Sequence, residues 1–526
     1  MFSDLEPITV TSTGFEKRSR FSGYAYVDAD IVIGQVGFDE WTLSRPSEQF
    51  PGRQDGCYMS AIYENEQWKV GADFKGYCKI YIYRNGLDWA FSNSFSELVH
   101  VVRAQGWRVT PNEAQLDMWL PAPTFWQQLA TFQTAVQEIS LLPRQAELTA
   151  SISGGLVWQS AVTAKHQENH LAYEDGVRDF VQIWLSRLLT VVEDESSQLE
   201  VELTGGRDSR TTLALVLGAK QMQKSEINER LTVISSKNHS LDLQCAEQIS
   251  EQFGLRFNRP LPTMGQPQVK LAPYQRWYQF ALGSYGPIVF PPASRRNGVF
   301  KIGGHGGEGH RGFYGYETLE NPIKTHPNMR SQKTRAELNS AMKETESILA
   351  KEYPDFDPLV AHYKEFRDRL HSGLHSLNQV RMQPLSSHLL EEAMEFSGSE
   401  ARERGQILFD IIGATAPHLM MMPFETLEKS PSKTILDQLL RPFEINLRVG
   451  KIYGRPVNTV ASRSSWPDLL EAFHDADQTL SSDALAGDIR GEARSLANML
   501  RRGESWGHAR NSVPLHQVLL ASLIQG

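Results

Sequence analysis

The alternation of apolar and polar positions predicts a strand-rich first half of the chain. Residues 21–33 alternate in part, and the strand-like runs 57–63 and 68–70 can pair across a polar turn. Asn85-Gly86 is a hairpin signal that precedes another β-rich run at 88–91. We therefore predict an antiparallel sheet domain at the start of the chain.

The second half shows a different period. From about residue 173 apolar side chains recur at helical spacing, at Val177, Phe180, Val181, Trp184 and Leu188. Segments of two kinds then alternate, with predicted strands at 199–203 and 231–235 and predicted helices at 211–219 and 241–253. Such alternation predicts a parallel sheet. Beyond about residue 330 the pattern is mainly helical and is broken at Pro354, Pro423 and Pro442.

The two patterns predict two domains, residues 1–165 and residues 166–526, with the boundary near 161–170. The expected fold class is α/β together with α+β: an antiparallel β-rich domain, then a parallel-sheet domain that carries a helical C-terminal lobe.

Composition and charge exclude some classes of function. The chain has 526 residues, of which 40% are hydrophobic, as is typical of a globular protein. Its formal net charge of −9 argues against a general nucleic-acid surface. Three scattered cysteines are too few for a disulfide framework or a zinc site. No signal-peptide pattern and no apolar run of ~20 residues is present. We expect a cytoplasmic protein with neither membrane nor nucleic-acid partners.

The strongest chemical signal is a glycine turn between a predicted strand and a predicted helix, with the sequence Leu203-Thr204-Gly205-Gly206-Arg207-Asp208-Ser209-Arg210. Glycines allow the backbone to approach a phosphate closely, and the helix start offers N–H groups at its positive end. Thr204 and Ser209 add hydroxyl groups, and Asp208 is a candidate Mg²⁺ ligand against a pyrophosphate. The alternative is a glycine-rich turn without chemistry in an ordinary α/β domain.

The turn differs from a Walker loop, which needs a lysine and has no internal aspartate. It resembles instead the S-G-G-x-D-S loop of ATP pyrophosphatases, with Thr204 in place of the first serine. The resemblance implies ATP cleavage between the α- and β-phosphates.

Most of the chain resembles the asparagine-synthetase-like amide ligases, a family that includes asparagine synthetases, β-lactam synthetases and lasso-peptide cyclases. In the first half the resemblance rests on four segments in order, namely Gly56-Cys57-Tyr58, Asp73-Phe74-Lys75-Gly76, Phe91-Ser92-Asn93-Ser94 and Ile139-Ser140-Leu141-Leu142-Pro143. It implies a glutaminase-like (Ntn-type) domain over 1–165 and an ATP-dependent synthetase domain over 166–526.

The start of the chain departs from this family, whose glutaminases use an N-terminal cysteine as nucleophile. The sequence begins Met1-Phe2-Ser3, and no cysteine precedes Cys57. We therefore expect a degenerate glutaminase domain, and no glutamine hydrolysis. Cys57 and Cys78 fall within strand patterns, where a buried, inert thiol is the favoured interpretation.

A second glycine-rich segment reads Gly303-Gly304-His305-Gly306-Gly307-Glu308. The family resemblance places a second Mg²⁺ ligand at Glu308, and at His305 the residue that deprotonates the attacking amine. Imidazole ordinarily titrates near pH ~6.5, which suits such a base. Hydrogen bonding of His305 to phosphate is the alternative, and a zinc site at His305, Glu308 and His310 lacks the H-E-x-x-H spacing.

Four further residues are candidates. Arg210 and Arg311 flank the glycine segments and are either clamps for phosphate or carboxylate, or surface side chains. Asp242 either shapes the nucleotide pocket or is a charge at a helix start. By resemblance, Lys451 neutralises charge as pyrophosphate leaves.

The expected function is an ATP- and Mg²⁺-dependent ligase that adenylates a carboxylate and transfers it to an amine, both from small molecules or peptides. The residues expected to bind the nucleotide are Leu203, Thr204, Gly205, Gly206, Asp208, Ser209, Arg210, Gly304, Gly306 and Gly307. A lasso-type peptide cyclase and a non-catalytic nucleotide sensor are the alternatives. Sulfur transfer to tRNA would predict a basic surface and catalytic cysteines, and the composition of this chain indicates neither.

Overall fold

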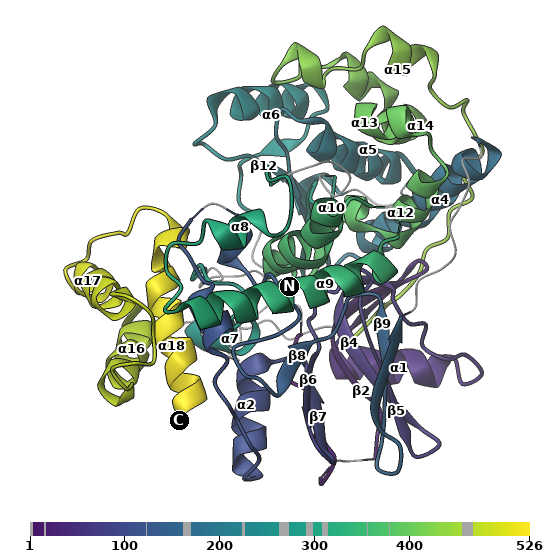
Figure 1. Ribbon diagram of the computed structural model, residues 1–526. Coiled ribbons are helices and arrows are strands. Elements are labelled where there is room, and N and C mark those ends of the chain that lie inside the picture. Colours follow the sequence, from purple (N-terminus) through teal and green to yellow (C-terminus); the bar gives the residue numbers. More distant parts are fainter. Residues whose placement is uncertain are drawn as a thin grey trace.

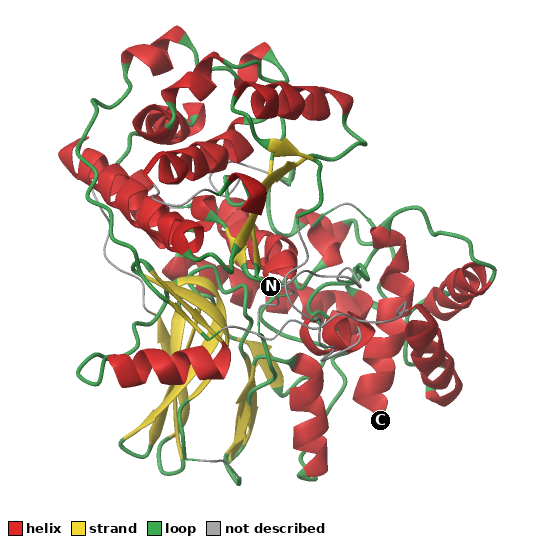
Figure 2. Cartoon of the chain, turned by 180° about the vertical axis from the view of Figure 1, so that it is seen from behind, coloured by secondary structure: helices red, strands yellow, loops and turns green. Residues whose placement is uncertain are grey.

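The computed structural model describes residues 4–14, 17–122, 124–160, 170–222, 227–261, 273–290, 298–307, 314–354, 356–377, 379–454 and 466–526. It contains two antiparallel-type sheets packed together at one end and a parallel sheet surrounded by helices at the other (Figures 1 and 2). The expected α/β class with a β-rich first part and a helical last part is confirmed at this level.

The first part of the chain builds two sheets. A four-stranded antiparallel sheet has the order β1-β7-β6-β8, with β1 (Thr9–Thr11), β6 (Tyr81–Asn85), β7 (Asp88–Ser92) and β8 (Ile139–Leu141). A seven-stranded mixed sheet has the order β10-β9-β5-β4-β2-β3-β16, with β2 (Arg20–Val27), β3 (Asp30–Ile33), β4 (Asp55–Glu64), β5 (Gln67–Ala72), β9 (Ala146–Ser151), β10 (Gly155–Ser160) and β16 (Ile452–Tyr453). Since β16 comes from near the end of the sequence, the C-terminal part of the chain completes the N-terminal sheet.

The hairpins predicted from the sequence are present. β4 pairs with β5 from Met59 to Glu64, and the turn residues Asn65 and Glu66 both have positive φ. β6 pairs with β7 up to the Asn85 and Asp88 pair, so the hairpin turns at Gly86 as its hairpin signal predicts. Local turn chemistry therefore sets the register of both pairs.

A five-stranded, fully parallel sheet forms the centre of the second part. Its order is β13-β12-β11-β14-β15, with β11 (Gln198–Glu202), β12 (Leu231–Ile234), β13 (Arg256–Phe257), β14 (Val299–Ile302) and β15 (Arg381–Met382). Leu199, Val201 and Val233 are fully buried, as expected for strands covered on both faces. The predicted strands and the parallel sheet are confirmed, and β15 is a strand within the region predicted to be mainly helical.

Helices cover this sheet and form the rest of the molecule. In chain order they are α1 (Gly34–Ser44), α2 (Phe95–Ala104), α3 (Glu113–Asp117), α4 (His170–Glu193), α5 (Arg207–Met222), α6 (Ser240–Gln252), α7 (Pro273–Phe280), α8 (Asn321–Lys324), α9 (Gln332–Glu352), α10 (Pro358–His362), η3 (Tyr363–Ser372), α11 (Gly373–Ser376), α12 (His388–Glu395), α13 (Ser399–Arg404), α14 (Gln406–Thr415), α15 (Lys433–Asp437), α16 (Trp466–Thr479), α17 (Ile489–Arg501) and α18 (Val513–Gln525). Short 3₁₀ segments are η1 (Phe125–Gln127), η2 (Asn228–Arg230), η4 (Pro384–Ser386), η5 (Pro417–Met421), η6 (Leu427–Lys429) and η7 (Ala509–Ser512). Among the described residues, none of these helices has the length and apolarity that a membrane crossing requires.

The two parts share buried polar contacts as well as apolar ones. Arg187 on α4 is 1% exposed, and it donates to the carboxylate of Asp55 on β4 at 2.5 Å and to the backbone oxygen of Asp28 at 2.7 Å. A buried arginine with a carboxylate and carbonyl partners fixes the orientation of α4 against the N-terminal sheet, because no other position satisfies all its donors.

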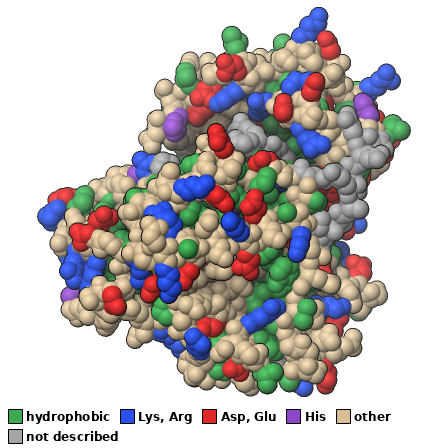
Figure 3. Space-filling view, in the orientation of Figure 1, with side chains coloured by type: hydrophobic (Ala, Val, Ile, Leu, Met, Phe, Trp, Pro, Cys, Tyr) green, Lys and Arg blue, Asp and Glu red, His purple; other side chains and the backbone are tan. Residues whose placement is uncertain are grey.

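On the face in Figure 3, side chains of both charge signs are interspersed.

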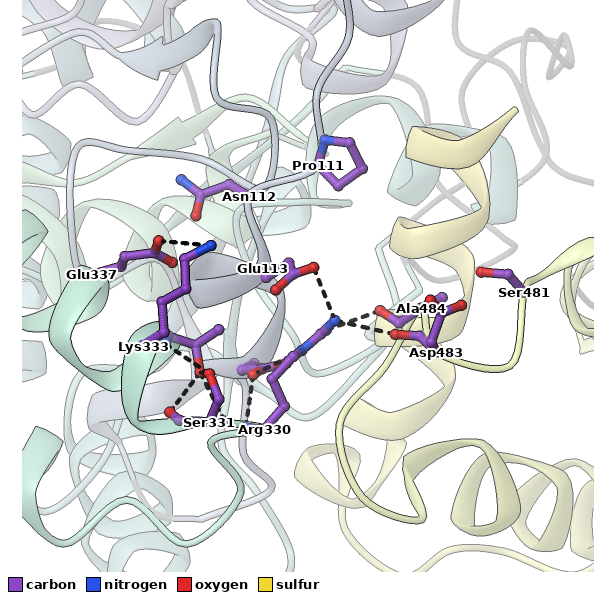
Figure 4. Close-up of polar contacts among 12 residues, drawn as sticks. Pro111, Asn112, Glu113, Arg330, Ser331, Lys333, Glu337, Ser481, Asp483 and Ala484 are labelled. Carbon is purple, nitrogen blue, oxygen red and sulfur yellow. Dashed lines mark hydrogen bonds and ion pairs between the residues drawn. The ribbon is translucent and has the colours of Figure 1, made fainter.

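Arg330 forms a second polar junction, between α3, the start of α9 and the loop that joins α16 to α17 (Figure 4). Its Nε donates to both carboxylate oxygens of Asp117, at 2.9 and 3.1 Å. Its terminal nitrogens donate to the backbone oxygens of Asp483 and Ala484, at 3.2 and 3.0 Å. One planar guanidinium therefore joins three segments that are far apart in sequence.

We expect Arg330→Lys to destabilise the fold by about 2–3 kcal/mol, because a lysine cannot reach Asp117 and two carbonyls together, and the buried carboxylate loses its bidentate partner. Chemical unfolding measures this change. Lys333→Ala is the matched control: the Lys333–Glu337 pair nearby is exposed, so its loss should leave the unfolding midpoint unchanged. Equal midpoints for Arg330→Lys and wild type would contradict the assignment.

Candidate functional site

The strand order of the parallel sheet locates the candidate site. From β11 the chain proceeds to β12 and β13 on one side, whereas β14 and β15 lie on the other side. The carboxyl ends of β11 and β14 are therefore a topological switch point, where open parallel sheets bind ligands. The glycine turn (residues 204–209) follows β11, and the second glycine segment (residues 303–307) follows β14.

These two segments touch backbone to backbone. A Cβ on Gly304 would lie 2.6 Å from the backbone nitrogen of Ser209, and one on Gly307 would lie 2.8 Å from the Asp208 carboxyl carbon. No side chain fits at either position without moving the neighbouring segment. The glycines are therefore needed for the approach of the second glycine segment to Asp208 at the start of α5.

Hydrogen bonds fix the conformation of the glycine turn. The Thr204 and Ser209 hydroxyls lie 2.9 Å apart, and the Thr204 N–H donates to the Ser209 Oγ at 3.0 Å. The Gly205 N–H donates to the Asp242 carboxylate at 2.7 Å, so Asp242 shapes the turn from the start of α6. Leu203 is buried and continues the ladder of β12 by donating to the Ile234 oxygen at 2.9 Å.

A cavity of about 180 Å³ opens where the two segments meet. We call it the glycine pocket, and its lining is Asp208, Gly304, His305, Gly306, Tyr363, Arg367, Asp368, His371 and Ser372. The last five residues all come from η3, which is a π-helix. Its i→i+5 hydrogen bonds give about 4.4 residues per turn, which aligns positions 363, 367–368 and 371–372 along one stripe. The spacing of Tyr363, Arg367 and His371 by four residues would place these three on one face of an α-helix as well, so the wider π-helical turn mainly brings Asp368 and Ser372 into the same stripe.

His305 lies beside a fixed carboxylate. Its Nε2 is 3.8 Å from Glu202, which ends β11 and also binds Arg381. Burial alone would raise the pKa of Glu202, but the charges of Arg381, His305 and Lys301 outweigh burial and lower it. Glu202 is thus an ionised carboxylate, whose charge stabilises a positive charge on the imidazole of His305.

The N-terminal part reaches the glycine pocket. The Tyr77 hydroxyl lies 2.9 Å from the Ser386 hydroxyl, which in turn donates to the backbone oxygen of His305 at 3.1 Å. Lys75 forms an ion pair with Asp368 at 3.5 Å. Two residues of the predicted glutaminase-like domain therefore help to hold opposite walls of the pocket.

Arg210 does not face the glycine pocket. Its guanidinium is fully buried and donates to the backbone oxygens of Leu419, Met422 and Pro423, and it stacks on Phe424 with a distance of 3.5 Å to the ring centroid. Burial lowers its pKa to about 10. Both interpretations made from the sequence need correction, since Arg210 is neither a surface residue nor directed at a phosphate: it anchors the loop after η5 to α5.

Lys451 is also placed away from the pocket. Its backbone N–H donates to Asp30 at 2.8 Å and its oxygen accepts from Ile31, because it directly precedes β16 at the edge of the N-terminal sheet. The side chain is exposed. The structure therefore gives no support for the expected role at a leaving pyrophosphate. Glu308, His310, Arg311 and the first three residues lie outside the described residues.

The expected burial of the cysteines is confirmed, since Cys57 and Cys78 are both 0% exposed. Burial raises the pKa of both thiols, to about 12 for Cys78. Neither thiolate is therefore available near neutral pH.

Sequence reasoning missed the η3 side of the pocket. Tyr363, Arg367 and His371 recur every four residues, which is the α-helical spacing, so periodicity could have grouped these three, whereas the position of Asp368 and Ser372 depends on the π-helical turn. Glu202 could have been found, because an acidic residue at the end of the strand directly precedes the glycine turn.

Comparison with models of known protein families gives no match, and comparison with curated proteins also gives none. Among the described residues, no cluster of three or more histidine, cysteine, aspartate or glutamate side chains forms a ready metal site. The case for a function therefore rests on the geometry of the site.

His371 provides a test of the pocket's polarity. Burial, with Arg367, His375 and His305 nearby, lowers its pKa to about 3, and the ring lies 2.6 Å from the Tyr285 hydroxyl. The unfolded chain takes up this proton near pH ~6.5, so between these values the unfolded state binds more protons and stability falls as pH falls.

We expect this histidine to cost about 2 kcal/mol of stability between pH 8 and pH 5, a loss that His371→Gln removes. Denaturant unfolding across this range measures the slope. The exposed His474→Gln control should keep the wild-type slope. An unchanged slope in His371→Gln would contradict a buried, neutral imidazole.

Proposed function

We propose that this protein is an ATP-dependent amide ligase that adenylates a carboxylate and transfers the acyl group to an amine. The observation that carries the proposal is the meeting of the glycine turn and the second glycine segment at the switch point, with Asp208 and His305 lining one pocket. The sequence resemblance indicates the class of reaction, and the pocket lined by Asp208 and His305 is where we propose that it takes place.

The polyphosphate of ATP would lie against the glycine turn, where the N-terminus of α5 favours negative charge. Thr204, Gly205, Gly206 and Ser209 would then face the phosphates, and the hydroxyls of Thr204 and Ser209 would turn from each other toward the ligand. Leu203 would position the turn rather than donate to it. The close approach of Gly304 and Gly307 holds the second glycine segment against the start of α5, beside the place that the phosphates would take.

Asp208 would hold Mg²⁺, and the sequence resemblance names Glu308, which lies outside the described residues, as the second carboxylate. The Cβ-free surface of Gly307 against the Asp208 carboxylate fits such a cradle. The ion would offset negative charge on the pyrophosphate as it leaves.

In the first step an oxygen of the substrate carboxylate attacks the α-phosphorus and pyrophosphate departs. In the second step the amine attacks the acyl carbon, AMP departs, and the proton of the amine passes to the ring nitrogen of His305 that faces away from Glu202. The carboxylate of Glu202, 3.8 Å from the Nε2, stabilises the resulting imidazolium. No step requires glutamine.

The first test is Asp208→Asn in an assay of AMP and pyrophosphate, with Mg²⁺-ATP, a panel of carboxylates, and added amines or ammonia. We expect acid-dependent AMP formation by the wild type and a loss of at least about 100-fold in the variant, because charge neutralisation at the phosphates is lost. Asp179→Asn on the exposed side of α4 is the matched control and should keep activity. Formation of ADP and phosphate would refute adenylation, and a response to peptides alone would favour the cyclase.

The second test separates a base from a phosphate contact at His305. His305→Gln keeps a hydrogen-bonding group but cannot take up the proton, so we expect amide formation to fall about 100-fold while acid-dependent ATP–pyrophosphate exchange persists. Glu202→Gln should reduce the second step in the same direction. A parallel loss of exchange and amide formation in His305→Gln would assign His305 to phosphate binding.

A further inference from the structure

A small cavity between the two parts of the chain has no role in the proposed reaction. We call it the junction chamber: its volume is about 10 Å³, enough for one water-sized particle. Asp55 and Tyr77 line it from the N-terminal part. Trp184 on α4, Arg381 on β15 and Gln383 line it from the second part.

The chamber is lined by buried donors that lack partners. The Nε and Nη1 of Arg381, the Nε2 of Gln383 and the Nε1 of Trp184 make no hydrogen bond to any described residue. These side chains are 4%, 6% and 0% exposed. Four unpaired nitrogen donors on three side chains that line one cavity are costly unless something there accepts from them.

The strongest acceptors in the wall are already used. The Asp55 carboxylate accepts from Arg187 at 2.5 Å, from Ser387 at 2.7 Å and from the backbone of His388 at 2.9 Å, and it lies 2.9 Å from the His388 ring. The Gln383 oxygen accepts from Ser376 at 3.2 Å. The unpaired groups on Trp184, Arg381 and Gln383 are therefore all N–H donors, and two of the four nitrogens belong to the Arg381 guanidinium.

This imbalance distinguishes an anion from a water. A water molecule accepts only two hydrogen bonds, so at least two of the four N–H groups would stay unpaired, even though the Tyr26 hydroxyl in the wall can accept one of its protons. An anion accepts from every donor and also balances the edge of Arg381 that Glu202 does not reach. The size of the chamber excludes carboxylate, phosphate and sulfate.

We propose that the junction chamber binds a single small monovalent anion, chloride being the ordinary occupant. The anion joins α4, β15 and the segment after β15 at the contact with the N-terminal sheet. It also bears on the glycine pocket, because the same guanidinium binds Glu202, whose other oxygen lies 3.8 Å from His305. The proposal does not depend on the reaction assigned to that pocket.

Bromide is the direct probe, since it resembles chloride and scatters anomalously. Crystals of the full chain grown or soaked in bromide should show an anomalous peak in the chamber, within contact of the Arg381 Nε and the Trp184 Nε1. A chamber that holds a water, with no anomalous signal, overturns the proposal.

Thermal unfolding in chloride and in gluconate at equal ionic strength tests binding in solution. We expect the melting temperature of the wild type to rise with chloride but not with gluconate, and the half-saturating chloride concentration to rise about tenfold in Trp184→Phe, which removes one charge-assisted donor but keeps the ring. Gln383→Leu is a second variant with the same expectation.

Trp277→Phe is the matched control. The indole nitrogen of Trp277 is also buried without a partner among the described residues, but Trp277 does not line the chamber. Its loss should shift the melting temperature equally in both salts and leave the chloride response intact. An equal response of the wild type to chloride and gluconate, or an unchanged half-saturating concentration in both chamber variants, overturns the proposal.

Discussion

The close approach of two backbones across neighbouring strands is the constraint on which the candidate site depends. β11 and β14 run side by side, so the segments that follow them emerge at the same edge of the sheet. Gly304 and Gly307 let these segments touch at Ser209 and Asp208. A Cβ at Gly304 would lie 2.6 Å from the Ser209 nitrogen and one at Gly307 would lie 2.8 Å from the Asp208 carboxyl carbon, so a larger residue at either position would displace that neighbour. The pocket therefore depends on the strand order and on glycine, which has no Cβ, at positions 304 and 307.

Sequence reasoning was reliable where the chemistry is local. Turn signals such as Asn85-Gly86 predict hairpins because the turn residues themselves fix the geometry. The strand, glycine turn and helix around Asp208 follow from the same kind of local evidence. Arg210 shows the limit. Its position beside the turn indicated a ligand contact, but the direction of a long side chain depends on what packs on the helix, here the carbonyls of a loop about 200 residues later in the sequence.

The η3 wall of the pocket shows a second limit. Arg367, Asp368 and His371 are three and four residues apart and so share one helix face, but nothing in the sequence indicates that this face meets the two glycine segments. Lys451 was misplaced for a related reason. The C-terminal part of the chain was treated as one helical lobe, whereas β16 returns to the edge of the N-terminal sheet and takes Lys451 with it. Both features are set by contacts between distant segments.

These distant contacts give the N-terminal sheets a role that needs no chemistry of their own. Tyr77 supports the second glycine segment through Ser386, and Lys75 holds Asp368 on η3. Asp55 binds Arg187 on α4 and His388 at the start of α12, and so fixes both helices. Asp55 and Arg381 both line the junction chamber. Removing the N-terminal part would leave Asp368, Arg187 and the Ser386 hydroxyl without these partners, at the cost of several buried polar groups. The N-terminal part therefore contributes to the geometry of the candidate site through these contacts.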